Sequence, residues 1–332
     1  MKRNLITLII FASLAASLTA LTVFDLYRFA HQTGSQPQKL ILIETGSSLK
    51  KIARQLQEHK LISSSQRFII LNRLLKNSTL LKAGEYRIEA AASPLNIIEI
   101  LKQGRVFQRR LSIPEGFTLQ QIGARLQARS LCQNNEFIQL TSSPEYLKNL
   151  QVPDPNLEGY LFPSTYNYSR QTSCRQIVEQ MLNTGKIELQ KLLSQNPTNN
   201  LNRHQILTLA SMIQKEAGNN DEMPVIASVF HNRLRRKMRL ASDPTTIYAL
   251  GKNFDGNLRR RDLHHPSPYN TYRHHGLPPG PICSPGHKAI RAAINPDQTD
   301  YLYFVSRNNG QHQFSRTLKE HNQAVRKYQL KR

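Results

Sequence analysis

Glu216 is the residue of this chain whose type and position point most directly to chemistry. Apolar side chains recur through residues 205–217 at the three- and four-residue spacing of a buried helical stripe. Glu216 follows Met212 by four residues and Ile213 by three, so we expect its carboxylate to project from the apolar side. Burial favours the protonated carboxyl group, and a general acid needs the raised pKa that results. The more frequent role for such a residue is structural, in a bond to a nearby Arg or loop amide.

Two further carboxylates are candidates for the same site. Asp243 stands in the run Ser242-Asp243-Pro244, which predicts a helix N-cap at Asp243 with proline at the first helical position. Its alternative role is that of a second catalytic carboxylate, since glycoside hydrolysis normally uses two. Glu158 lies in a predicted loop, where it could line a cleft or accept hydrogen bonds from backbone amides.

The candidates for substrate binding are hydroxyl, phenol and amide side chains near these carboxylates. The chain has no Trp, so a carbohydrate site would have to use Tyr rings for packing against sugars. A buried Tyr is nevertheless more often a core residue with a bonded hydroxyl. The residues that we consider for substrate binding are Thr245, Tyr248, Tyr269, Asn270 and Tyr272, together with Glu158.

The histidines and cysteines predict neither a metal site nor a cofactor. The pairs His264-His265 and His274-His275 lie in a polar, basic region and lack the spacing of metal ligands. Three cysteines are too few for a disulfide framework and match no metal motif, although one bridge would suit an oxidising compartment. They are Cys132, Cys174 and Cys283.

The amino terminus predicts a membrane anchor. Residues 4–24 carry no charge, and at about 1.5 Å per residue they can span a hydrocarbon core of about 30 Å. The run is longer than a signal-peptide core and lacks a good cleavage site, so we expect the anchor to be retained. Lys2 and Arg3 place the tail, residues 1–3, in the cytoplasm by the positive-inside rule. Residues 25–39 are predicted to be a polar linker to an extracytoplasmic body.

The strong positive charge restricts the choice of partners. The formal net charge is +23 and the sequence pI is about 10.2, which favours a polyanionic partner. The predicted topology argues against nucleic acid, so an anionic wall polymer or an acidic lipid surface fits better. Single basic runs such as Arg233–Arg239 and residues 259–261 are expected to be solvated faces.

The body is predicted to be an α+β protein with a weak internal repeat. Residues 41–62 align with residues 111–132, and apolar residues and a glycine coincide in the two copies. Each copy is predicted to form a short strand, a glycine turn with a hydroxyl N-cap, and an amphipathic helix. Further on, a long helix is expected over residues 174–195, and a hairpin from residues 301–305 and 312–315.

Ordered motifs along the carboxyl-terminal half resemble a known family. They include LEGYLFPSTY at residues 157–166, ASMIQKEAG at residues 210–218, and the later runs SDPTTIYALG and SPYNTYRHHGLPPGP. Taken in order, they resemble the endolytic murein transglycosylases, the YceG-like or MltG family. The resemblance covers nearly the whole chain, the anchor included.

The resemblance implies an inner-membrane enzyme with a single transmembrane helix, small LysM-like α+β modules in residues 40–150 and a mixed α/β catalytic domain in residues 151–332. Such enzymes cut the β-1,4 bond between N-acetylmuramic acid and N-acetylglucosamine within nascent peptidoglycan strands and leave 1,6-anhydro ends. The family's catalytic glutamate corresponds to Glu216. The sequence departs from the family pattern at Gln214, where an acid is usual, at Tyr160, where Trp is frequent, and at Ser164, where Asp is frequent.

Three other functions are open at this point. A muramidase would use Glu216 and Asp243 as two carboxylates. A non-catalytic scaffold would bind peptidoglycan and recruit cell-wall synthases. For the enzyme as well, the resemblance implies penicillin-binding synthases as partners. A general polyanion-binding module would depend on the positive charge and lose its ligand in salt.

Overall fold

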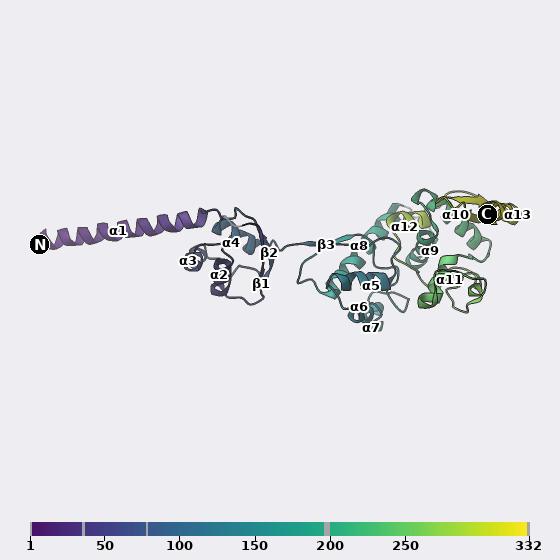
Figure 1. The fold of residues 1–332 in the computed structure, drawn as a ribbon, viewed down its shortest axis with the longest axis horizontal. Helices are drawn as coiled ribbons and strands as arrows, with labels where there is room; N and C mark the ends of the chain where they lie inside the picture. The colour runs from purple at the N-terminus through teal and green to yellow at the C-terminus, as the bar shows by residue number, and fades with distance from the viewer. Residues whose placement is uncertain (1, 35–36, 78, 196–199, 331–332) are drawn as a thin grey trace. The chain divides into compact units, whose positions relative to one another are not determined.

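The computed structural model describes residues 2–34, 37–77, 79–195 and 200–330 and divides into two compact units. Unit 1 comprises Met1–Arg109 with Asn167–Gln171, and unit 2 comprises Arg110–Tyr166 with Thr172–Arg332. The predicted boundary at 150/151 therefore falls inside unit 2, and residues 110–150 share a unit with Glu216. Figure 1 shows the order of the elements along the chain.

Unit 1 contains the amino-terminal helix and a small α+β module. Strands β1 and β2 pair antiparallel, with Lys39 opposite Ile88. Helices α2, α3 and α4 pack with this two-stranded sheet, and the core contains Ile41, Leu56, Tyr86 and Ile97. The elements are α1 (Lys2–His31), β1 (Lys39–Ile43), α2 (Leu49–Glu58), α3 (Ser65–Leu74), β2 (Gly84–Ile88) and α4 (Pro94–Gln103).

Helix α1 runs without a break from the predicted anchor into the core of unit 1. Among the described residues, it is the one helix long and apolar enough to cross a membrane. At its end, Phe29 and Ala30 are 2% and 5% exposed within the core of the module. The predicted polar linker is therefore wrong for residues 25–31, because those residues continue the helix and bury apolar side chains. Residues 35–36 of that predicted linker lie outside the described part of the chain.

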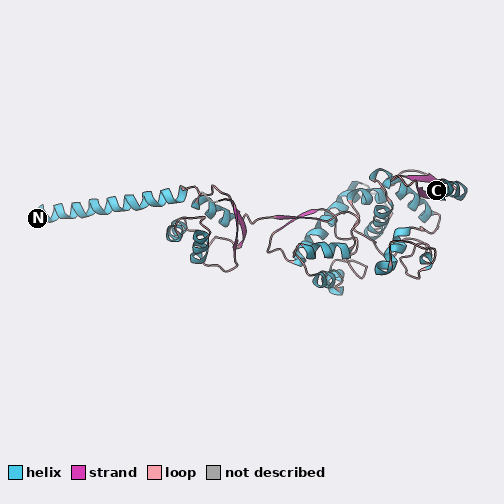
Figure 2. Cartoon of the chain, in the orientation of Figure 1, coloured by secondary structure: helices cyan, strands magenta, loops and turns pink. Residues whose placement is uncertain are grey.

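Unit 2 is mainly helical, as Figure 2 shows by colour. Its strands are short: β3 (Arg109–Ser112) pairs with β4 (Thr165–Tyr168), and the division between the units runs through both. The predicted hairpin is confirmed as β5 (Tyr303–Ser306) and β6 (His312–Ser315). The helices are α5 (Leu119–Ala128), α6 (Asn134–Thr141), α7 (Pro144–Asn149), α8 (Cys174–Gln195), α9 (Arg203–Glu216), α10 (Met223–Arg235), α11 (Asp243–Leu250), α12 (His287–Ile294) and α13 (Leu318–Val325).

The core of unit 2 forms around α9, which packs against α10 and α12. Apolar side chains from the three helices are fully enclosed, so the position of α9 is fixed along its length. They include Leu209, Met212, Ile213, Ile226, Phe230 and Ile290, all at most 1% exposed. The predicted mixture of helices and strands is confirmed, with helices in the majority.

The internal repeat is visible in the structure. In each copy a strand leads to a glycine with positive φ, Gly46 at 78° and Gly116 at 77°. A hydroxyl then caps the following helix. The Ser48 side chain accepts from the Lys51 amide of α2, and the Thr118 side chain accepts from the Gln121 amide of α5. The order strand, two helices, strand recurs in β1–β2 and β3–β4, with α7 added in the second copy.

A tyrosine in the last strand of each copy extends the match beyond the predicted repeat. The hydroxyl of Tyr86 donates to the carbonyl of Lys82 at 2.7 Å, and that of Tyr166 donates to the carbonyl of Phe162 at 2.5 Å. Both tyrosines are buried and both bond four residues back. The shared detail indicates that the two modules have the same plan.

A disulfide joins Cys132 to Cys174, and Cys283 is free and buried. The bridge links the segment after α5 to the start of α8 within unit 2. The sequence left this pairing open, because spacing alone does not specify a partner.

Candidate active site

Glu216 is the last residue of α9, in agreement with the predicted helix. The helix begins with a capping box in which the Asn202 side chain accepts from the Gln205 amide at 2.9 Å and the Gln205 side chain accepts from the Asn202 amide. Its buried stripe includes Ile206, Leu209 and Ile213. Because the core fixes this stripe, the carboxylate at the end of the helix has a fixed direction.

The surroundings of Glu216 raise its pKa to about 7. The main cause is burial, since protein atoms surround the carboxylate although the residue as a whole is partly exposed. The negative charge of Asp243 adds to the rise. The Ser242 hydroxyl, which donates to Oε1 of Glu216 at 2.6 Å, and the charge of Arg233 lower the pKa. A group with this pKa is present in both protonation states near neutral pH, so it can donate and accept a proton.

Ser242 serves as the backbone cap of α11, which corrects the predicted cap at Asp243. Asp243 is the first residue of the helix, and Pro244 follows it. Ser242 makes no side-chain capping bond, because its hydroxyl is directed to Glu216 instead. The exposed Asp243 carboxylate accepts from the Tyr272 hydroxyl at 2.6 Å. Asp243 therefore lies beside Glu216 with a hydrogen-bond partner of its own.

Arg233 is a member of this cluster that the sequence predicted to lie on a solvated face. Its side chain is partly buried, and burial lowers the pKa of the guanidinium. Its Nε donates to the carbonyl of Leu302 at 2.6 Å, and Nη1 donates to the carbonyl of Leu240 at 2.6 Å. The guanidinium thus supplies positive charge near Glu216 while it ties α10 to two other segments.

Two of the predicted substrate ligands are buried and bonded within the protein. The Thr245 hydroxyl donates to the carbonyl of Ser242 at 2.7 Å and lies 2.8 Å from the Thr271 hydroxyl. Asn270 donates from its amide nitrogen to the carbonyls of Leu263 and His265, and its amide oxygen accepts from the Tyr272 backbone at 3.0 Å. These bonds fix the loop that carries Tyr269 and Tyr272.

Tyr272, Tyr248 and Tyr269 are partly exposed, and their ring faces are the ones that could meet a ligand. The rings of Tyr248 and Tyr269 pack with centroids 5.0 Å apart. Burial raises the pKa of the Tyr269 hydroxyl to about 12, and it raises the pKa values of the Tyr248 and Tyr272 hydroxyls as well. All three hydroxyls therefore stay protonated at neutral pH, and those of Tyr248 and Tyr272 donate to Glu158 and Asp243.

Glu158 is a second buried carboxylate in unit 2, at 5% exposure. The backbone amide of Leu119, at the start of α5, donates to its two oxygens at 3.1 and 3.2 Å, and the Tyr248 hydroxyl donates at 3.4 Å. Burial raises its pKa to about 7 in spite of these donors. Of the two roles predicted for Glu158, the geometry shows the bonding of a backbone amide.

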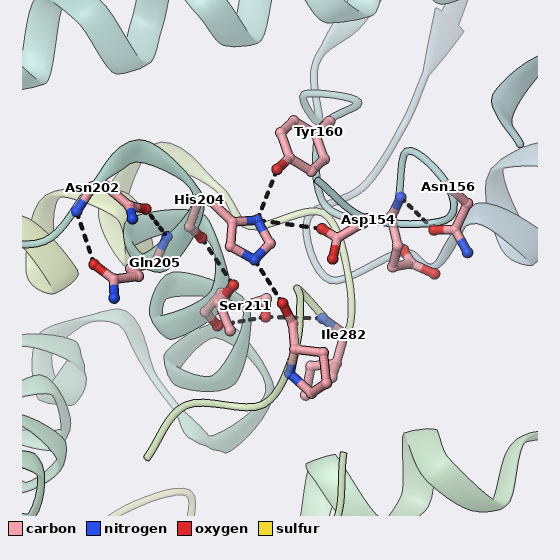
Figure 3. A network of polar contacts seen from close by, with 11 residues as sticks. Asp154, Asn156, Tyr160, Asn202, His204, Gln205, Ser211 and Ile282 are labelled. Carbon is pink, nitrogen blue, oxygen red and sulfur yellow. Dashed lines mark hydrogen bonds and ion pairs between the residues drawn. The ribbon is translucent and has the colours of Figure 1, made fainter. Parts of the chain in front are cut away.

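A polar network around His204, also in unit 2, was not predicted from the sequence. His204 Nδ1 lies 2.8 Å from the Tyr160 hydroxyl and 3.3 Å from Asp154 Oδ2, and Nε2 lies 2.6 Å from the carbonyl oxygen of Pro279. Figure 3 shows Tyr160 and Asp154 converging on the same ring nitrogen. Tyr160 and His204 also line a cavity of about 370 Å³. No local pattern could have revealed this network, because its members are far apart in the sequence.

The histidine pairs bond to the backbone of their surroundings. His264 Nδ1 lies 3.1 Å from the carbonyl of Arg260, and His275 Nδ1 lies 3.0 Å from the carbonyl of Lys237. Within the described part of the chain, no three residues among His, Cys, Asp and Glu are grouped as metal ligands.

Comparison with known proteins decides the family. A model of the YceG-like family matches residues 41–327. The chain belongs to the YceG-like family. A Bacillus subtilis relative named endolytic murein transglycosylase is 36% identical over 304 residues, which cover 87% of this chain and 84% of the relative. A Streptococcus pneumoniae relative of the same name is 33% identical and is matched over 80% of this chain and 53% of its own length, so this chain spans about half of it.

A solved YceG-like structure from Listeria monocytogenes has the same fold over most of its length. It is 33% identical to this chain, with a TM-score of 0.59, and the match covers 87% of this chain and 100% of the Listeria chain. In this YceG-like chain, Gln214 is used structurally, since its side-chain oxygen accepts from the Gly286 amide at the start of α12 at 2.9 Å. Glu216 is the one carboxylate in residues 210–218.

Proposed function

We propose that this protein is a membrane-anchored endolytic lytic transglycosylase that cleaves the β-1,4 bond between N-acetylmuramic acid and N-acetylglucosamine. The observation that carries the proposal is Glu216, a fixed carboxylate whose pKa is raised to about 7 by burial. Membership of the YceG-like family and the names of two relatives support the choice of peptidoglycan strands as substrate.

One carboxylate is sufficient for this reaction. Protonated Glu216 donates its proton to the glycosidic oxygen as the bond from that oxygen to C1 of the muramic acid breaks. The C6 hydroxyl of the same sugar then bonds to C1, and the ionised Glu216 accepts the hydroxyl proton. The carboxyl group is thereby restored and a 1,6-anhydro end is formed, with no water consumed.

The residues around Glu216 serve this proton cycle in different ways. Ser242 stabilises the ionised state by its hydrogen bond, and Arg233 does so by its charge, so the base step is favoured. The Tyr248, Tyr269 and Tyr272 rings would contact the sugars. The Tyr269 hydroxyl would donate to an acetamido or lactyl group, whereas the Tyr248 and Tyr272 hydroxyls already donate to Glu158 and Asp243. Thr245 and Asn270 are positioning residues in this proposal, because their polar atoms are used inside the protein.

A two-carboxylate muramidase is the second candidate, favoured by the closeness of Asp243 to Glu216. Asp243 is near enough for its charge to raise the pKa of Glu216. In this reaction Asp243 would activate a water, and the product would carry a reducing end. The bond from Tyr272 to Asp243 favours the transglycosylase, because it already occupies one of the carboxylate oxygens.

The remaining parts of the chain suit a protein attached to the outer face of the cytoplasmic membrane. Helix α1 is long and apolar enough to span the bilayer, and the basic residues before it favour a cytoplasmic amino terminus. The Cys132–Cys174 disulfide supports an oxidising compartment for unit 2. The β1–β2 and β3–β4 modules would be the LysM-like, glycan-binding parts, and penicillin-binding synthases would be the protein partners.

The deciding experiment compares the soluble products of nascent peptidoglycan treated with full-length protein in detergent. The wild type should release anhydromuropeptides, and Glu216→Gln should lose at least about 100-fold in rate, since a well-placed acid/base contributes roughly 10²–10⁴-fold. Glu145→Gln, an exposed glutamate in the first turn of α7, is the matched control and should keep full activity.

Mass spectrometry separates the alternatives. Reducing-end products, heavier than the anhydro products by one water, would support the muramidase and a catalytic Asp243. Glycan binding without any product, in the wild type and the Glu216→Gln variant alike, would support a non-catalytic scaffold. Binding that shows no preference for glycan over DNA and is lost in salt would support a general polyanion binder.

A further inference from the structure

Four exposed aliphatic side chains lie on α3 and on the segment that follows it in unit 1. Ile70, Leu74, Leu75 and Leu80 are 50%, 66%, 42% and 45% exposed, and we call them the α3 patch. Among the described residues of unit 1 outside α1, Leu40 is the other large apolar side chain with comparable exposure. Single exposed apolar residues are common on protein surfaces, but a cluster indicates a contact surface.

The α3 patch follows, by one helical turn, a contact with the end of the predicted membrane span. Arg67 of α3 pairs with Asp25 of α1, its Nε 3.0 Å from Oδ2. Asp25 is the first charged residue after the uncharged run of residues 4–24. Arg67, Ile70 and Leu74 are spaced by three and four residues, so they share one face of α3. Helices α1 and α3 are in contact.

The charge around the α3 patch matches an anionic surface. Residues 65–82 carry the basic side chains of Arg67, Arg73, Lys76 and Lys82 and no acidic residue. Aliphatic side chains next to basic ones are typical of segments that lie in the interface of a bilayer with anionic lipids. Long basic side chains can reach the headgroups while the aliphatic ones enter the acyl boundary.

We propose that the α3 patch is inserted into the headgroup layer of the same anionic membrane that α1 crosses. Unit 1 then touches the bilayer at two places, through the spanning helix and through α3. This inference rests on the proposed anchoring by α1, and its test therefore includes a separate reporter for that helix.

The absence of Trp from the chain makes a direct test available. Leu74→Trp in the full-length protein places a single fluorophore in the α3 patch. Ile187→Trp, at 64% exposure on α8 against 66% for Leu74, is the matched control, and Leu14→Trp reports on the anchor. Each variant is reconstituted in phosphatidylglycerol vesicles with and without lipids brominated near the headgroup or deep in the acyl chains.

The expected result is a blue-shifted emission for Leu74→Trp that is quenched most by shallow bromines. Leu14→Trp should be quenched most by deep bromines, and Ile187→Trp should show neither effect. A water-like, unquenched Leu74→Trp beside a quenched Leu14→Trp would overturn the proposal while the anchor stands, and would leave the α3 patch to a protein partner. An unquenched Leu14→Trp would refute the anchor itself. Equal quenching of Leu74→Trp in phosphatidylcholine vesicles would refute the role of anionic lipid.

Discussion

Removal of the Ser242 hydroxyl is expected to shift the pH dependence of the reaction. This hydroxyl donates to Oε1 of Glu216 at 2.6 Å. A hydrogen bond of this kind is stronger to a carboxylate than to a neutral carboxyl group. Ser242→Ala therefore destabilises the ionised form of Glu216 selectively, and the pKa of Glu216 should rise above its value of about 7.

The size of the shift follows from the strength of the bond. A hydrogen bond to a charged group contributes about 1.5–3 kcal/mol, and one pKa unit corresponds to about 1.4 kcal/mol. The pKa of Glu216 should thus rise by about one to two units. A water molecule that takes the place of the hydroxyl would bring the shift toward the lower value.

The assay is the pH profile of kcat/KM, which reports the ionisation of the free enzyme. Because protonated Glu216 starts the reaction, wild-type activity should fall as the pH rises through about 7. In Ser242→Ala this fall should occur about one unit or more higher, whatever the height of the plateau. The matched control is Ser143→Ala, since Ser143 is also an N-cap serine close to a proline and an acidic residue but caps α7. An unshifted profile in Ser242→Ala, or equal shifts in both variants, would refute the reasoning.

Three further predictions concern stability, measured by urea unfolding of the full chain. Burial raises the pKa of Glu158 from about 4.5 to about 7, so the folded state loses stability as the pH rises between these values. Glu158→Gln should gain about 3 kcal/mol relative to wild type between about pH 4 and pH 8, and a constant difference would contradict this. Cys132→Ala opens a bridge across 42 residues and should lower the free energy of unfolding by about 4 kcal/mol. Reductant should have no further effect on this variant. Gly159→Ala would place a Cβ 2.2 Å from a proline side-chain carbon. It should lower the free energy of unfolding more than Gly276→Ala, where the positive φ alone costs about 1–2 kcal/mol.

The features that the sequence predicted correctly are those encoded by local periodicity and capping. The α9 helix and the strand–glycine–helix repeat were predicted from spacing alone, and the structure confirms both. Their signals lie within one or two turns of chain, where propensity and packing act on the same residues. Glu216 was placed on the apolar side of α9 for the same reason.

The features that the sequence missed depend on residues distant in the chain. The bond from Ser242 to Glu216 spans 26 residues, and no spacing rule connects a cap serine to a helix-end acid. The network of Asp154 and His204 and the pairing of Cys132 likewise require the fold to be known. The polar residues in 25–39 predict a linker. The burial of Phe29 could not be predicted, because it depends on how α3 and α4 pack against the end of α1.

The burial of Phe29 and Ala30 has a practical consequence for any shortened form of this protein. A fragment that begins just after α1, or one freed by proteolysis at that point, would lack two side chains of the module's core and the partner of Arg67. The loss of one buried Phe alone is worth about 1.5–3 kcal/mol, a large share of what a small module has. Cleavage after α1 would therefore loosen unit 1, and a shortened version should begin before Asp25 rather than after His31.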